Sequence, residues 1–168
     1  MDKALKVVEE MARLGIIRGY AIGGGIAATY YIEPVLTYDL DVFFIPVKEG
    51  LDELAPVYEF ARSRGYAEQA EALIVEGFPV QFIPAYNRLV REAVEDSATL
   101  TYRGVKAKVV KAEFLAAIAL QTGRAKDRER VVRLLDSGCV DRAALAGILE
   151  RHGLAEKLKM IEGGKDER

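Results

Sequence analysis

The segment that decides the fold is residues 16–46, which read IIRGYAIGGGIAATYYIEPVLTYDLDVFFIP. An apolar run over residues 16–22 leads into three consecutive glycines, Gly23–Gly25, and these are followed by the helix-forming residues 26–31. Glycines before a helix leave backbone N–H groups uncovered, and such groups can bind phosphate. The alternative role of the glycines is a tight turn or a point of close packing. The pattern predicts a strand, a glycine turn and a helix.

The strand that follows carries two carboxylates. Pro34 ends the helix because its ring disfavours α geometry in the preceding residue, and residues 35–46 are rich in β-branched and aromatic side chains. Alternate side chains of a strand share a face, so Asp39 and Asp41 lie about 7 Å apart on one surface. Their repulsion is about 2 kcal/mol at an effective dielectric constant of about 20. Mg²⁺ compensates such a pair and recruits substrate phosphates; two ordinary solvent-exposed aspartates are the alternative.

Gly23, Gly25 and Ala28 also fit the dinucleotide-binding pattern G-x-G-x-x-[GA], which predicts NAD binding without a metal. In that fold the acidic residue follows the apolar residues of its strand, whereas Asp39 and Asp41 precede the apolar run. The chain also lacks the further strand–helix–strand units of a dinucleotide-binding domain. A dinucleotide-binding fragment is therefore the least favoured interpretation of this sequence.

The rest of the chain predicts strands and helices first and only helices afterwards. Apolar residues at helical spacing predict the helices, and β-branched or aromatic runs on both sides of a glycine predict the hairpins. The predicted elements are helices at 2–14, 50–64 and 87–95, hairpins at 72–84 and 99–110, and helices at 112–121, 125–136 and 141–151.

This order of elements predicts an α+β fold, a mixed β-sheet flanked by helices with a helical C-terminal layer. We expect a single domain over residues 1–161, strand-rich over 15–110 and helical over 111–161. Residues 162–168 have too little apolar surface to offset the entropy of ordering them, so a flexible tail is predicted there.

Composition excludes several classes of protein. The chain has 24 Lys and Arg against 26 Asp and Glu, a net charge of -2, so no overall cationic field attracts nucleic acid. A single cysteine and a single histidine exclude an internal disulfide and a Cys/His zinc cluster. No segment has the length and hydrophobicity of a membrane span or a signal peptide, so a cytoplasmic location without membrane contact is predicted.

Residues 124–130 form a run of mixed charge at the start of a predicted helix. Arg124 and Lys126 are weak candidates for contact with a triphosphate group. The alternative, which is usual for such runs, is a solvent-exposed helix face with i,i+4 ion pairs.

Two groups of residues resemble the minimal nucleotidyltransferase superfamily. They are Gly23-Gly24-Gly25-Ile26-Ala27 with Tyr30-Tyr31, and Thr37-Tyr38-Asp39-Leu40-Asp41-Val42-Phe43. The resemblance implies the polymerase β-type fold, in which Asp39 and Asp41 hold Mg²⁺ on a nucleoside triphosphate while Gly23, Gly24, Gly25 and Thr37 contact the nucleotide. Residues 109–135 are similar to the C-terminal helices of the branch that contains nucleotidyltransferase-type toxins of abortive-infection systems.

The chain departs from that family at three positions. Members carry a third acid on a later strand, where this sequence has Gln81; its neutral amide does not act as a base, although its carbonyl oxygen can bind a metal weakly. The toxin branch carries a lysine near Ala119, and relatives are often basic at the position of Leu36. These departures favour retention of Mg²⁺ and nucleotide binding over retention of turnover.

The chain is therefore predicted to be a Mg²⁺-dependent nucleotidyltransferase that transfers a nucleoside monophosphate from a nucleoside triphosphate to a hydroxyl of RNA, protein or a small molecule. Asp39, Asp41 and Gln81 are its expected catalytic-site residues. The alternative is a catalytically degenerate member that acts as a binding or interaction module, for example a toxin–antitoxin component. A homodimer or a cognate protein partner is compatible with the helical C-terminal third.

Overall fold

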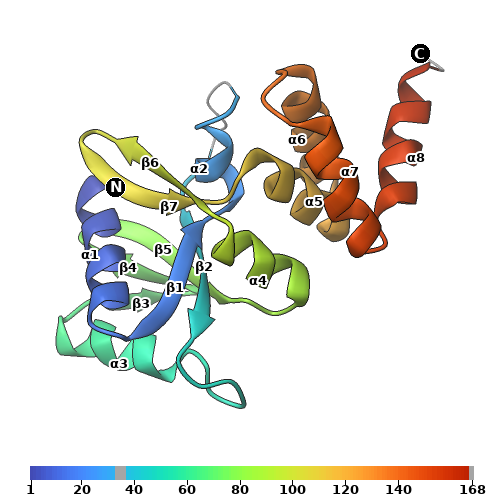
Figure 1. The fold of residues 1–168 in the computed structure, drawn as a ribbon. Coiled ribbons are helices and arrows are strands. Elements are labelled where there is room, and N and C mark those ends of the chain that lie inside the picture. Colours follow the sequence, from blue (N-terminus) through green and yellow to red (C-terminus); the bar gives the residue numbers. More distant parts are fainter. Residues whose placement is uncertain (33–36, 167–168) are drawn as a thin grey trace.

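The computed structural model describes residues 1–32 and 37–166, and Figure 1 shows how they are arranged. The helices and strands in chain order are α1 (Asp2–Arg13), β1 (Ile17–Ile22), α2 (Gly24–Ala28), β2 (Leu40–Pro46), α3 (Ala55–Ser63), β3 (Ala67–Gln69), β4 (Ala72–Val75), β5 (Phe78–Pro84), α4 (Arg88–Glu95), β6 (Ala98–Tyr102), β7 (Val105–Val109), α5 (Ala112–Thr122), α6 (Ala125–Asp136), α7 (Arg142–Arg151) and α8 (Ala155–Asp166).

The strands form one mixed sheet in the order β3-β4-β5-β2-β1-β7-β6. The central strand β2 pairs antiparallel with β1 and parallel with β5. Ile22, at the end of β1, pairs with Val42 near the start of β2, and Asp41 pairs with Gln81 of β5. The glycine turn after β1, the start of β2 and the middle of β5 therefore meet in one region of the sheet.

Helices cover this sheet and form a second layer beside it. α1 packs against β1 and β7, and α4 packs against β1 and β2. The last four helices, α5 to α8, lie together at one side of the sheet (Figure 1), and α5 contacts both α2 and α4. The α+β class is confirmed: a mixed sheet flanked by helices with a helical C-terminal layer.

The helix that follows the glycine turn ends before residue 31, where the sequence predicted its end. α2 ends at Ala28, and the Thr29 hydroxyl donates to the carbonyl of Ile26 at 2.7 Å. Such a local hydrogen bond competes with helix continuation. β2 begins at Leu40, so Asp39 lies just before the strand; the predicted strand start at 35–36 lies outside the described residues.

Three further boundaries differ from the prediction. α3 begins at Ala55 instead of residue 50, because Pro56 is favourable only in the first turn of a helix. β3 was not predicted, since all three of its residues are exposed and no alternation marks it. Residues 162–166 continue α8, which is anchored where Leu158 and Ile161 pack against the core; a flexible tail over 162–168 stays a prediction.

None of the helices in residues 1–32 and 37–166 is long and apolar enough to cross a membrane.

Candidate active site

A cavity of about 420 Å³ lies between the sheet and the helices α5 and α6. Its sheet floor consists of Asp41 and Phe43 from β2 together with Gln81 and Ile83 from β5. The register pairs Asp41 with Gln81 and Phe43 with Ile83, so the four side chains form two adjacent rows on one face of the sheet. One row is polar and the other is apolar.

The three glycines before α2 are needed because the turn approaches the neighbouring residues closely. A Cβ atom at Gly23 would lie 2.2 Å from the ring of Phe43, and one at Gly25 would lie 2.9 Å from the Cβ atom of Thr37. At Gly24 it would lie 1.8 Å from Oδ2 of Asp41, and Gly24 also has a φ of +58°. The turn is tied to β2 by the backbone N–H of Gly23, which donates to the carbonyl of Asp41 at 2.9 Å.

At all three positions the glycine is therefore required by close packing against neighbouring residues. Gly24 and Gly25 also line the cavity, so the turn contributes to the wall beside Asp41. α2 has only five residues, so its dipole is small. An anion bound at this turn would therefore depend mainly on other groups of the cavity.

Asp41 is a partly buried carboxylate that the protein does not neutralise. Its pKa is raised to about 6, chiefly by burial and also by the charge of Asp39, while Arg130, Lys126 and Arg124 act in the opposite direction through space. No hydrogen bond to the carboxylate contributes to this pKa within the described part of the chain. Asp39, by contrast, accepts a hydrogen bond from the Thr37 hydroxyl at 3.2 Å.

Four cations line the cavity opposite the sheet floor, and we call them the cationic cluster: Arg124, Lys126, Arg130 and Arg133. Arg124 precedes α6 and the others lie on it. The weak candidates Arg124 and Lys126 are thus both at the cavity.

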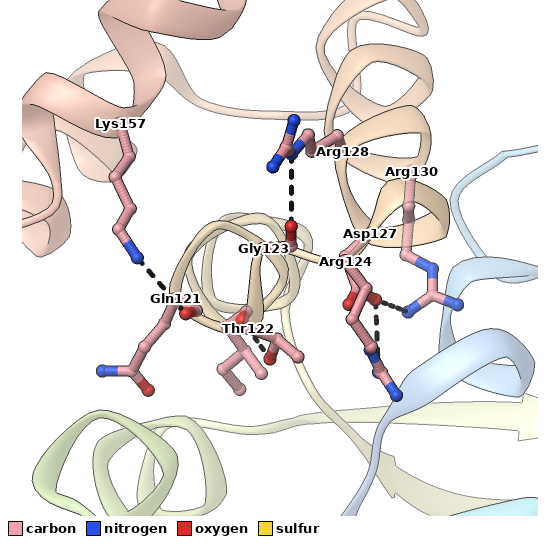
Figure 2. A network of polar contacts seen from close by, with 9 residues as sticks. Gln121, Thr122, Gly123, Arg124, Asp127, Arg128, Arg130 and Lys157 are labelled. Carbon is pink, nitrogen blue, oxygen red and sulfur yellow. Dashed lines mark hydrogen bonds and ion pairs between the residues drawn. The ribbon is translucent and has the colours of Figure 1, made fainter.

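Asp127 organises part of the cationic cluster, as Figure 2 shows. Its side chain is 2% exposed and lies 2.7 Å from Nε of Arg124 and 3.7 Å from Nη1 of Arg130. Nε of Arg130 is buried and lacks a hydrogen-bond partner in the residues that the structure places. The interpretation of residues 124–130 as a solvent-exposed face is wrong for Asp127 and Arg130, whose side chains are only 2% and 14% exposed where α6 packs against α5 beside the cavity.

The corner between α5 and α6 is held by backbone contacts that leave Arg128 outside the cavity (Figure 2). Gly123 has a left-handed conformation at the end of α5, and Nε of Arg128 donates to its carbonyl at 3.2 Å. Nζ of Lys157 donates to the carbonyl of Gln121 at 3.4 Å. Cations at these carbonyls stabilise the end of α5 and fix the point at which α6 begins.

Gln81 lies in the row of Asp41, as the strand prediction requires. Its Nε2 atom donates to the carboxylate of Glu71 at 3.2 Å. Ala119 also lines the cavity, so no amine is supplied from that position of α5.

Sequence reasoning missed several residues of the cavity, among them Tyr86, Asp127, Arg130 and Arg133. The i,i+3 spacing of Arg124, Asp127 and Arg130 is a signal that could have identified the ion-pair group. Tyr86 follows β5 and is 57% exposed beside the cavity, and no local pattern distinguishes it from the other tyrosines.

The oxygen atoms around Asp41 suit a hard cation that takes most of its ligands from water and a bound substrate rather than from the protein. The described ranges contain no group of three or more His, Cys, Asp or Glu side chains arranged to hold a metal. Two carboxylates, with the amide oxygen of Gln81 in the same row, match the way Mg²⁺ binds through few protein ligands plus waters and phosphates.

Solved structures with a similar fold are nucleotidyltransferase-like proteins. An antigenic nucleotidyltransferase-like protein from Paracoccidioides brasiliensis has a TM-score of 0.55 at 15% identity, over 94% of this chain and 91% of that one. The antibiotic-resistance factor ANT(2'')-Ia in solution has a TM-score of 0.55 at 12% identity, over 99% and 97% of the two chains. Its complex with adenylyl-2''-tobramycin has a TM-score of 0.54 at 14% identity, over 88% and 98%.

No protein-family model and no curated protein sequence matches the chain. The likeness is therefore one of fold, and the chain has the fold of nucleotidyltransferase-like proteins.

Proposed function

We propose that the protein is a Mg²⁺-dependent nucleotidyltransferase that transfers a nucleoside monophosphate from a nucleoside triphosphate to a hydroxyl group. The observation that supports this most directly is the unneutralised carboxylate of Asp41, which shares one cavity with the cationic cluster. A ligand that complements both sides must carry negative charge toward the cations and a metal toward the carboxylates. The Mg²⁺ complex of a nucleoside triphosphate has this character.

Asp39 and Asp41 are the residues that would hold Mg²⁺. Two carboxylates are enough for this cation, because it keeps waters and takes further ligands from phosphates. When bound, it neutralises the charge that develops on the phosphates during transfer.

The chain's own side chains bind the phosphates and the nucleoside. Arg124, Lys126 and Arg130, which line the cavity, supply positive charge toward the phosphates. Gly24 lets the turn approach the Asp41 carboxylate, while Gly23 and Gly25 keep the turn close to Phe43 and Thr37, so that Gly24, Gly25 and Thr37 border the nucleotide at the cavity. Phe43, Ile83 and Tyr86 offer apolar surface for the nucleoside.

The acceptor supplies a hydroxyl from RNA, a protein or a small molecule. Its oxygen forms a bond to the α-phosphorus, the bond from that phosphorus to the bridging oxygen breaks, and pyrophosphate leaves with the electron pair. Such in-line transfer is mostly a matter of positioning and charge stabilisation.

A second candidate is a binding or interaction module that keeps the cavity without turnover, for example a toxin–antitoxin component with a cognate partner. The neutral amide of Gln81 beside Asp41 favours this alternative, as does Ala119 in place of a cation. The two candidates share nucleotide binding and differ in pyrophosphate release.

The experiment that tests the proposal is thermal unfolding with ATP, GTP, CTP or UTP, with and without Mg²⁺. A ligand that binds only the native state raises the unfolding midpoint. We expect a rise with at least one nucleotide that requires Mg²⁺ and is lost in the double variant Asp39→Asn with Asp41→Asn. Asp52→Asn, a change in an exposed loop, is the matched control and should keep the rise.

Absence of a rise with all four nucleotides would contradict the proposal. A rise without pyrophosphate release from any bound nucleotide would favour the binding module.

A further inference from the structure

The two flanks of Asp41 are chemically different. β2 lies between β1 and β5, so the glycine turn that follows β1 and the side chain of Gln81 on β5 are on opposite sides of Asp41. If the leaving phosphates lie toward the glycine turn, where Gly24 and Gly25 line the cavity, the attacking hydroxyl approaches the α-phosphorus from the other side, because attacking and leaving oxygens are in line. The acceptor side is then the β5 side.

A hydroxyl acceptor must lose its proton, and Gln81 has no basic group to take it. Two other carboxylates line the cavity. Asp127 is occupied by Arg124 and Arg130, and Glu129 projects from α6, the helix of the cationic cluster. Within the described residues, Gln81 donates its hydrogen bond to neither of them.

Glu71 lies on the acceptor side, at the turn between β3 and β4. It is exposed, and its carboxylate accepts the hydrogen bond from Nε2 of Gln81 at 3.2 Å. A carboxylate accepts only from the NH₂ of an amide, so this contact fixes the orientation of Gln81 and leaves its carbonyl oxygen as a free acceptor. Gln81 therefore connects Asp41 to a carboxylate supplied by a different strand turn.

We infer that Glu71 is the general base for the acceptor hydroxyl and that Gln81 is the residue that positions it. The inference rests on the proposed function and assigns its missing base. The acceptor O–H bond breaks, its proton goes to the Glu71 carboxylate, and the oxygen forms the new bond to the α-phosphorus as pyrophosphate leaves. The hydroxyl contacts Glu71 directly or through one water.

The test uses the full chain with water as the acceptor and Mg²⁺-dependent pyrophosphate release from the nucleotide that binds. Glu71→Gln should reduce the rate about 100-fold or more, the range expected when a general base is lost. Its binding of Mg²⁺ and nucleotide, measured by thermal shift, should be unchanged. Glu68→Gln, an exposed change on the neighbouring β3, should keep the wild-type rate.

A swapped pair separates a base from a merely structural contact. Glu71→Gln alone keeps a hydrogen-bonding side chain at position 71, so a structural role predicts little change in rate. Combining it with Gln81→Glu returns a carboxylate to the same hydrogen-bonded pair, and we expect recovery to within about 10-fold of the wild-type rate.

Four results would overturn the inference. They are a Glu71→Gln rate within threefold of wild type, a loss in Glu129→Gln without one in Glu71→Gln, no recovery in the folded double variant, and nucleotide binding by the wild type without pyrophosphate release. If the wild type binds no nucleotide, the proposed function fails first and the inference fails with it.

Discussion

The cavity contains two buried or partly buried carboxylates whose surroundings differ. Asp127, in the helical layer, is 2% exposed and has Arg124 at 2.7 Å and Arg130 at 3.7 Å. Asp41, on the sheet floor, has the same cations only at longer range, and burial raises its pKa to about 6. Asp127 is thus neutralised within the protein, whereas Asp41 is neutralised only when something binds. This difference supports the proposed ligand site at Asp41.

The largest expected effect is on the helical side. Asp127→Asn removes the charge that compensates Arg130, whose side chain is only 14% exposed, so the free energy of unfolding should fall by about 3 kcal/mol. Urea unfolding measures this, with Asp52→Asn as the control. A loss below about 1 kcal/mol would show that Asp127 does not hold the cationic cluster together.

The glycine turn provides the next largest effect. Gly24→Ala should cost about 2 to 3 kcal/mol, because the new Cβ meets Oδ2 of Asp41 at 1.8 Å and the residue has a positive φ. Gly15→Ala is the matched control, since Gly15 has a φ of +74° with no atom within 4 Å of the new Cβ, and it should cost about 1 kcal/mol.

Asp41→Ala should recover part of the Gly24→Ala loss, because it removes the atom that the new methyl group meets. Equal losses for the two glycine substitutions would mean that the turn does not press against Asp41.

A smaller effect of opposite sign is expected at Asp41. Its folded pKa of about 6 exceeds the ordinary 3.8, so the native state binds the extra proton between these values and is stabilised as the pH falls through about 6. Asp41→Asn removes the penalty of the buried charge and should raise the free energy of unfolding by about 1 to 2 kcal/mol at pH 7.5.

The gain from Asp41→Asn should shrink toward zero at pH 4, where wild-type Asp41 is already protonated in the native state. Urea unfolding of both proteins at the two pH values gives the difference. A destabilised Asp41→Asn at pH 7.5 would mean that the carboxylate is compensated within the protein.

The smallest expected effect is that of Lys126, on the helical side of the cavity, on the pKa of Asp41, on the sheet side. Lys126 lowers the pKa of Asp41 through space, so Lys126→Met should raise that pKa by less than one unit. Global stability should change by less than about 0.5 kcal/mol, because Lys126 is an exposed helix residue. Lys6→Met, on the exposed face of α1, should leave Asp41 unaffected; equal effects of the two lysines would indicate a response to net charge alone.

The sheet side of the site was predictable from sequence because its information is local. The glycine turn and the D-x-D pattern are adjacent in the chain, and the assignment of β5 placed Gln81 as a strand partner. Close approach to Phe43, Asp41 and Thr37 then explains the glycines.

The helical side was not predictable in the same way. Asp127 and Arg130 belong to a charged run that is indistinguishable from a solvated face until α6 packs against α5 beside the cavity. Glu71 reaches Gln81 only through the β3–β4 turn, and β3 has no sequence pattern. α8 is stabilised where Leu158 and Ile161 pack against the core, and this tertiary contact cannot be read from the local sequence.

The central claim is that Asp41 is left unneutralised for a metal-bound nucleotide. ¹³C NMR of the Asp41 carboxyl, titrated with and without Mg²⁺ and a non-hydrolysable nucleoside triphosphate, tests it directly. We expect a pKa of about 6 in the free protein, lowered by about 1 to 3 units when Mg²⁺ and nucleotide are both present. A pKa near 4 in the free protein, or one of about 6 that the ligands do not move, would contradict it.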